Sequence, residues 1–122
     1  RLKKDLLASS TERSGYRMFV LQGEEKADTI KDIAFQLRGE LQEPFVFVAA
    51  TTEGARGLLT VMLSEEAIAS GLHAGNLVKE AARLIQGGGG GQPHFATAGG
   101  KDGNGLPEAL ELILSQVDAH AR

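Results

Sequence analysis

The sequence predicts an α/β fold: a single domain with a mixed β-sheet of about three to four strands flanked by helices. Three observations lead to this prediction. Two apolar runs, FVFVAA at 45–50 and LLTVML at 58–63, have the continuous hydrophobic character of strands buried on both faces of a sheet. Other segments repeat their apolar residues at the 3.6-residue period of amphipathic helices. The length of 122 residues suits one compact domain.

The first third of the chain predicts a helical end, a strand and a helix. Residues 1–15 are polar, with Leu2 and Leu6 at helical spacing. We interpret them as the end of an upstream helical segment or as a tail, and 16–122 as the globular domain. Residues 16–23, YRMFVLQG, predict a strand. A helix over 27–41 is predicted by an apolar stripe that ends before Pro44; the stripe is Ile30, Ile33, Ala34, Leu37 and Leu41.

The middle third predicts a central antiparallel hairpin, formed by strands 45–50 and 58–63 around a turn at 51–57. Ser64 is expected to cap a helical turn over 64–70. A longer helix over 73–86 follows, with Leu77, Ala81, Leu84 and Ile85 as its buried stripe.

The last third begins with five consecutive glycines, Gly87, Gly88, Gly89, Gly90 and Gly91. We expect them to end the preceding helix and to form a loop, followed by a short buried strand at 94–98. Phe95 is expected to lie in the core rather than to stack on a base. A final helix starts near Pro107, and its apolar stripe is Leu110, Ile113, Leu114 and Val117.

Composition excludes several classes of function. The chain has no cysteine, which excludes disulfides, a thiol nucleophile and a thiolate zinc site. No apolar run approaches the length of a membrane span. The three histidines are scattered, so we expect no catalytic and no metal site in this chain. We also expect a cytoplasmic location. The net charge of −3 argues against a strongly basic nucleic-acid binder but leaves room for a local basic face.

Such a face is predicted beside the glycine run. Backbone N–H groups of a glycine loop form a concavity that holds an anion such as phosphate. Lys79 and Arg83 are four residues apart on one helix face that leads into the glycines, and Lys101 follows them. Two plainer interpretations stay open: the glycines are a helix stop with a tight packing turn, and the cations form a solvated face.

Residues 72–102 resemble a known family. The stretch LHAGNLVKEAARLIQGGGGGQPHFATAGGKD is similar to the C-terminal (C-Ala) domain of alanyl-tRNA synthetases, a member of the DHH-associated superfamily. The matching residues are Ala74, Gly75, Leu77, Val78, Lys79, the five glycines, Pro93, Ala96, Ala98, Gly99 and Gly100. Two positions depart from the family pattern: Gln92 replaces a basic residue and Thr97 replaces a glutamine.

The resemblance implies a module that contacts the elbow of alanine tRNA and couples aminoacylation with editing by upstream domains. This part alone would not be an enzyme, whereas the parent protein would be a ligase whose ATP, magnesium and zinc bind elsewhere, and a homodimer is compatible with the family. The expected RNA contacts are Lys79, Arg83, Gly87, Gly88, Gly89, Gly90, Gly91, Gln92, His94 and Lys101.

Two other functions remain open. DHH-family phosphoesterases and nucleases carry a related substrate-binding domain with a histidine directly after the glycines, whereas Gln92 and Pro93 precede His94 here. The second is a dimerisation module that uses the apolar stripe of the final helix.

Overall fold

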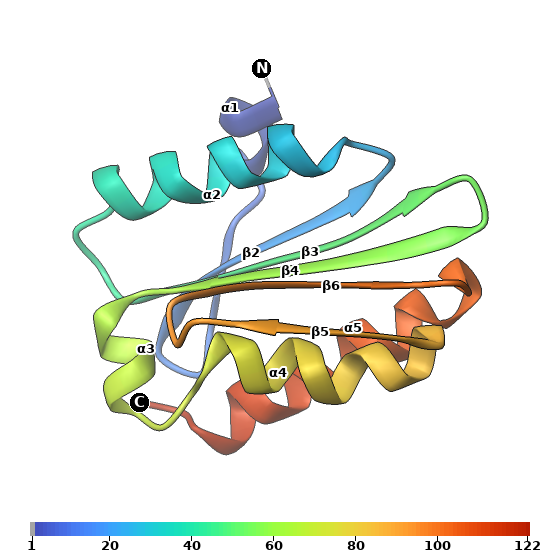
Figure 1. Ribbon diagram of the computed structural model, residues 1–122. Coiled ribbons are helices and arrows are strands. Elements are labelled where there is room, and N and C mark those ends of the chain that lie inside the picture. Colours follow the sequence, from blue (N-terminus) through green and yellow to red (C-terminus); the bar gives the residue numbers. More distant parts are fainter. Residues whose placement is uncertain (1) are drawn as a thin grey trace.

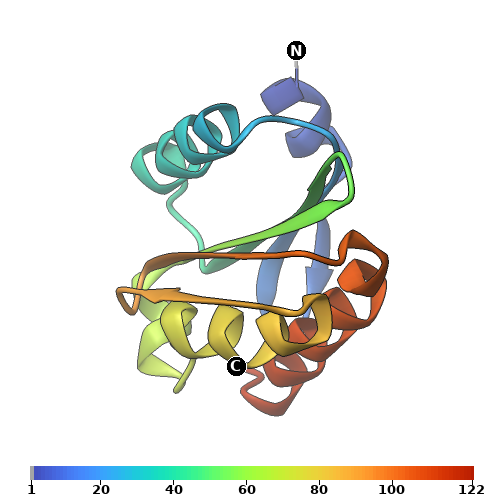
Figure 2. The same ribbon diagram turned by 45° about the vertical axis from the view of Figure 1, so that its right-hand side comes forward.

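A computed structural model describes residues 2–122, in which a β-sheet lies between two layers of helices (Figure 1). The elements in chain order are α1 (Leu2–Ala8), β1 (Thr11–Arg13), β2 (Tyr16–Gly23), α2 (Ala27–Glu40), β3 (Phe45–Glu53), β4 (Arg56–Leu63), α3 (Glu65–Ala69), α4 (Ala74–Ala81), η1 (Ala82–Ile85), β5 (Gly87–Gly91), β6 (Phe95–Gly100), η2 (Gly103–Gly105) and α5 (Leu106–Ala119). Helices α1 and α2 cover one face, and α3, α4 and α5 cover the other (Figure 2).

Within residues 2–122 the sheet has six strands in the order β1-β2-β3-β4-β6-β5. Strands β2 and β3 are parallel and are joined through α2, while every other pair is antiparallel. The mixed α/β class is confirmed, but the expected number of three to four strands is wrong. The two unforeseen strands are β1, which has only three polar residues, and β5, which consists of glycine alone.

The central hairpin of β3 and β4 is confirmed, and it separates two hydrophobic clusters. Val46 and Val48 of β3 face α4 and α5, whereas Phe45 and Phe47 face α2. Ser64 caps α3 as expected, because its Oγ accepts a hydrogen bond from the amide of Ala67 at 3.3 Å. The stripe of α5 is buried against the sheet of its own domain.

Helix α2 follows the prediction except for Leu41, which lies just beyond the helix and is only half-buried. Ile30, Ile33, Ala34 and Leu37 are buried, and the helix ends at Glu40. Phe35 lies off this stripe and is 42% exposed.

The predicted helix over 73–86 is divided into α4 and the 3₁₀ turn η1. Leu77, Ala81 and Ile85 are buried as expected, but the expectation for Leu84 is wrong, since it is 39% exposed. A 3₁₀ helix has three residues per turn, whereas an α-helix has 3.6. The change of period at η1 therefore rotates Leu84 off the stripe that an α-helix would continue. His73 caps α4 through Nδ1, which accepts from the amide of Asn76 at 3.1 Å.

The N-terminal residues pack on the domain. Residues 2–8 are helical, in line with the spacing of Leu2 and Leu6, and Leu6 is buried in the same cluster as the apolar stripe of α2. Strand β1 pairs with β2 through a two-residue turn whose residues, Ser14 and Gly15, have φ of 56° and 89°. That left-handed pair is typical of the turn that joins twisted antiparallel strands. The division of the chain at residue 15 stays a prediction.

Candidate nucleic-acid interface

The glycine run forms an edge strand of the sheet, so the expected loop is wrong. Strand β5 pairs with β6 from Gly87 opposite Gly100 to Gly91 opposite Ala96. Glycine disfavours a strand because ordering it costs about 0.5–1 kcal/mol more than ordering alanine. The backbone pairing with β6, itself held by β4, offsets this cost.

The glycines of β5 alternate between two environments. A Cβ at Gly89 would lie 2.5 Å from the Cα of Ala98, and a Cβ at Gly91 would lie 2.7 Å from the carbonyl oxygen of Phe95. Gly87 is equally crowded by the carbonyl of Gly99. At Gly88 and Gly90 the described residues leave open space around the position of a Cβ. The fold therefore requires glycine at 87, 89 and 91 but not at 88 and 90.

Gly88 and Gly90 lie on one side of the sheet with residues of β6. Their cross-strand partners are Gly99 and Thr97, which share their face. Thr97 is exposed and Gly99 is half-buried with room for a Cβ. Helix α2 covers this side of the sheet as far as Met62 of β4. We call the uncovered surface of Gly88, Gly90, Thr97 and Gly99 the open face.

The β5 backbone also exposes hydrogen-bonding groups at the sheet edge. Gln92 donates to the carbonyl of Phe95 at 3.0 Å, and Lys101 donates to the carbonyl of Gln86 at 3.4 Å. Hydrogen-bonded and non-hydrogen-bonded residue pairs alternate along an antiparallel ladder. Since residues 86 and 92 belong to hydrogen-bonded pairs, Gly88 and Gly90 between them also hydrogen-bond to β6. The N–H groups of Gly87 and Gly89 therefore point away from β6, where they can donate to a ligand.

Different side chains stand at the two ends of the open face. Arg56 begins β4 and is exposed, and its Nη2 lies 3.7 Å from the Cβ position of Gly99. Within residues 2–122 its guanidinium forms no ion pair and no side-chain hydrogen bond. At the other end the ring centroids of Phe35 and Phe95 are 5.0 Å apart.

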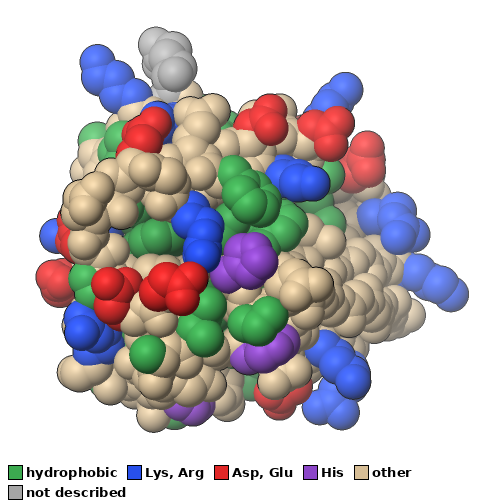
Figure 3. Space-filling view, turned by 60° about the vertical axis from the view of Figure 1, so that its left-hand side comes forward, with side chains coloured by type: hydrophobic (Ala, Val, Ile, Leu, Met, Phe, Trp, Pro, Cys, Tyr) green, Lys and Arg blue, Asp and Glu red, His purple; other side chains and the backbone are tan. Residues whose placement is uncertain are grey.

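That aromatic end also carries histidine. His94 is half-buried, and its carbonyl accepts from Leu63 at 2.8 Å. The space-filling view of this end shows hydrophobic and histidine side chains next to a broad area without coloured side chains (Figure 3). Gln92 is exposed in the same hairpin, and its carbonyl accepts from Gly75 at 3.2 Å.

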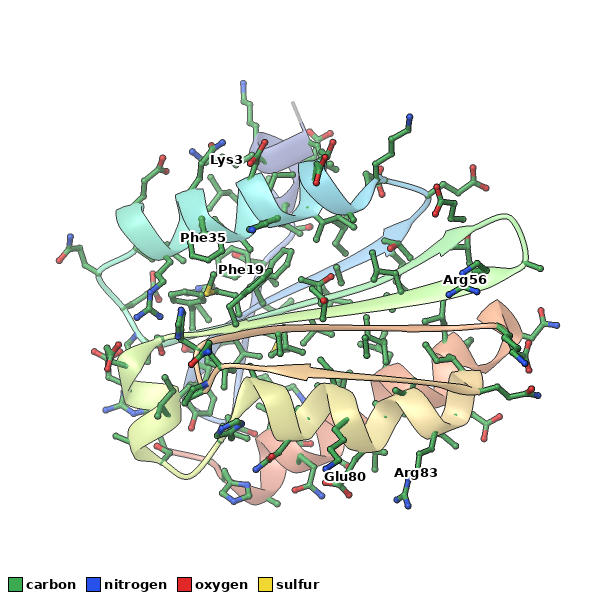
Figure 4. All side chains as sticks on the ribbon, viewed as in Figure 1. Lys3, Phe19, Phe35, Arg56, Glu80 and Arg83 are labelled. Atoms are coloured by element: carbon green, nitrogen blue, oxygen red, sulfur yellow. The ribbon has the colours of Figure 1, made fainter. Side chains whose placement is uncertain are left out.

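The predicted cations lie on different surfaces. Lys79 and Arg83 are both exposed on α4 and η1, in the helical layer beneath β5. Arg83 points away from the sheet (Figure 4). Lys101 directly follows β6 and is exposed at the end of the sheet where Arg56 stands. The structure thus groups Lys101 with Arg56 and leaves Arg83 on the opposite layer from the open face.

Sequence reasoning missed Arg56 and Phe35. Arg56 lay in a predicted turn, and its position beside Gly99 depends on strand pairing between distant segments. Phe35 stood outside the apolar stripe of a predicted helix, but a single apolar residue on a surface is common, so the sequence alone did not mark it.

No three histidine, aspartate or glutamate side chains of residues 2–122 converge on a possible metal position. None of the described helices is long and apolar enough to cross a membrane. The groups available for binding a ligand are the backbone N–H donors at the sheet edge, the cations at one end of the open face and the aromatic rings at its other end.

Comparisons with known proteins agree with this architecture. The family model of the DHHA1 domain matches residues 15–119. An alanine–tRNA ligase of Porphyromonas gingivalis is 54% identical over 97% of this chain, which spans 14% of that relative. The chain therefore corresponds to a small part of the curated relatives that it matches.

Solved structures share the fold. The C-Ala domain of Aquifex aeolicus alanyl-tRNA synthetase superposes with a TM-score of 0.77 at 22% identity, covering 90% of this chain and 98% of that domain. RecJ of Thermus thermophilus, solved with Mn²⁺, has a TM-score of 0.62 at 17% identity, covering 97% of this chain and 16% of RecJ. This chain belongs to the DHHA1 domain family and corresponds to the C-terminal, C-Ala-like region of alanine–tRNA ligases.

Proposed function

We propose that this domain binds tRNA at its elbow, as the C-terminal module of an alanine–tRNA ligase, and holds one tRNA for both aminoacylation and editing by other domains. The identity of 54% with an alanine–tRNA ligase supports the parent activity. The observation that carries RNA binding is the open face, where glycines that the fold does not need leave the sheet uncovered.

A flat surface without side chains suits a structured RNA. Double-stranded and folded RNA is recognised largely by shape, by backbone contacts and by stacking. Gly88 and Gly90 have room for larger residues, so their small size keeps the sheet accessible to a ligand rather than to another part of the chain. The outward N–H groups of Gly87 and Gly89 are donors for phosphate oxygens.

Two cations stand at one end of the open face, beside three carboxylates of the neighbouring loops, and the whole chain carries −3. Arg56 and Lys101 stand at one end and can contact a phosphate backbone there, whereas Lys79 lies on α4, in the helical layer beneath β5. Gln92 and His94 add polar groups at the other end. Contacts from a few cations predict moderate affinity that falls as salt rises.

The test fills the open face at one position. Gly90→Leu places a side chain where the described residues leave space, so the domain stays folded while RNA is kept from the sheet. We expect tRNA affinity to fall about tenfold, which corresponds to one or two lost contacts. Fluorescence anisotropy with labelled alanine tRNA measures this change.

The matched control is Gly39→Leu. Gly39 lies on α2, outside the open face, and a Cβ there also meets open space. We expect this variant to bind tRNA like the wild type. Equal affinity of both variants would refute the proposed contact.

A further inference from the structure

A cavity of about 370 Å³ opens where the parallel strands β2 and β3 end. The loop between β2 and α2, the end of β3 and the start of β4 form its walls, with Glu25, Lys26, Thr52, Arg56, Leu58 and Gly99 among the lining residues. Cavities of this volume hold small ligands in many proteins. None of the functions described so far uses this cavity.

The cavity is continuous with the open face. Gly88, Gly99 and Leu58 are consecutive cross-strand partners, from β5 through β6 to β4. Gly99 belongs to the open face and also lines the cavity. An RNA that lies on the open face therefore passes the mouth of the cavity.

A carboxylate at the cavity has an unsatisfied oxygen. Oε1 of Glu25 is buried and accepts no hydrogen bond from any described residue. It lies beside Gly23, where a Cβ would be only 2.7 Å away. Because no described donor holds this oxygen in place, the side chain can turn into the cavity, where the carboxylate accepts N–H groups that a ligand offers.

The charges of the cavity argue against a phosphate as the occupant. Glu24, Glu25 and Glu53 contribute three carboxylates, against the two cations Lys26 and Arg56. A neutral planar group with donors on one edge fits these charges better. The guanidinium of Arg56 offers a face on which a base stacks, as in many RNA complexes.

We propose that the cavity receives an unpaired guanine base of the bound RNA. The Watson–Crick edge of guanine carries two adjacent donors, the N1–H and the 2-amino group, and the carboxylate of Glu25 accepts both. Arg56 stacks on the base, and Leu58 packs against its edge. The proposal rests on the proposed RNA binding, because the open face presents the base to the cavity.

The test titrates the ¹⁵N-labelled chain with free nucleotides, followed by amide NMR shifts. We expect GMP to shift the amides of Thr52, Leu58 and Gly99 with millimolar affinity. IMP lacks the 2-amino group and loses one hydrogen bond to a charged acceptor, so it should bind about tenfold more weakly. AMP presents an acceptor at N1 and should bind more weakly still.

Two variants distinguish a specific effect of the Glu25 carboxylate from the effect of a change in net charge. Glu25→Gln should weaken GMP about tenfold and abolish its advantage over IMP. Glu12→Gln makes the same charge change on β1, at the opposite edge of the sheet, and should leave GMP binding unchanged. Equal shifts with GMP, IMP and inorganic phosphate, or shifts outside the cavity, would overturn the proposal.

The outcome is separable from that of the proposed function. Loss of tRNA affinity in Gly90→Leu together with no response to GMP would overturn the guanine cavity alone. A GMP response at the cavity together with full tRNA affinity in Gly90→Leu would support the cavity and refute the contact at the open face.

Discussion

Asp118 is the residue that ties the two ends of the chain together. Its carboxylate accepts hydrogen bonds from Nε and Nη2 of Arg13 at 3.0 and 2.8 Å, and from the hydroxyl of Ser14 at 2.6 Å. Next to it, the hydroxyl of Tyr16 donates to the carbonyl of His120 at 2.7 Å. These contacts hold α5 against the hairpin of β1 and β2.

Asp118 predicts an acid-sensitive contribution to stability. Its hydrogen bonds from Arg13 and then Ser14 lower its pKa from 3.8 to about 2. Because the folded pKa lies below the unfolded one, the contribution is complete above pH 3.8 and is lost as the pH falls toward 2. An NMR titration of the carboxyl carbons measures this pKa.

Variants identify the source of this pKa. Ser14→Ala should raise the pKa of Asp118 part of the way, because one of its two side-chain donors remains. Asp118→Asn should remove the dependence of the unfolding free energy on pH that this residue causes. A wild-type Asp118 that titrates near 3.8 would contradict the geometry.

At the same scale, the sequence identified residues whose role is local. Ser64 was recognised as a cap because its hydroxyl bonds three residues ahead, within the same segment. Arg56 was missed because its neighbour Gly99 is distant in the chain. The candidate cations Lys79 and Arg83 lie on α4 and on η1, because the predicted helix is divided between them, and no sequence pattern places these elements relative to the sheet.

At the scale of elements, β5 is the segment that the sequence described least well. Strands are recognised by alternating or continuous apolar side chains, and a run of glycines has none. Its strand conformation comes from pairing with β6, which the residues before Gly99 did predict as a buried strand.

The alternation in β5 predicts opposite effects of neighbouring substitutions. Gly90→Ala meets open space and restricts the unfolded chain, so the free energy of unfolding should rise by about 0.5–1 kcal/mol. Gly89→Ala forces a methyl group against Ala98 of β6, so the free energy of unfolding should fall by about 1–3 kcal/mol. Urea unfolding followed by circular dichroism measures both.

The two variants control for each other, because both replace a glycine of β5 by alanine. Similar destabilisation by both would show that position 90 is as crowded as position 89. It would also remove the argument that the glycine at 90 serves a ligand rather than the fold.

For the whole molecule, the sequence predicted the class, the central hairpin and most of the core. Those features depend on apolar periodicity within single elements, such as the stripe from Ile30 to Leu37. It did not predict that β6 joins β4 and places β5 at the edge, because strand order depends on contacts between distant segments. The open face exists only through that order.

The central claim is that this domain contacts the elbow of tRNA through the open face. The most direct measurement titrates the 122-residue chain with alanine tRNA and, in parallel, with an acceptor-stem hairpin that lacks the elbow, at low and moderate salt. We predict binding to the whole tRNA, weakening as salt rises, and little binding to the hairpin. Equal binding to both RNAs, or binding to neither by the folded chain, would contradict it.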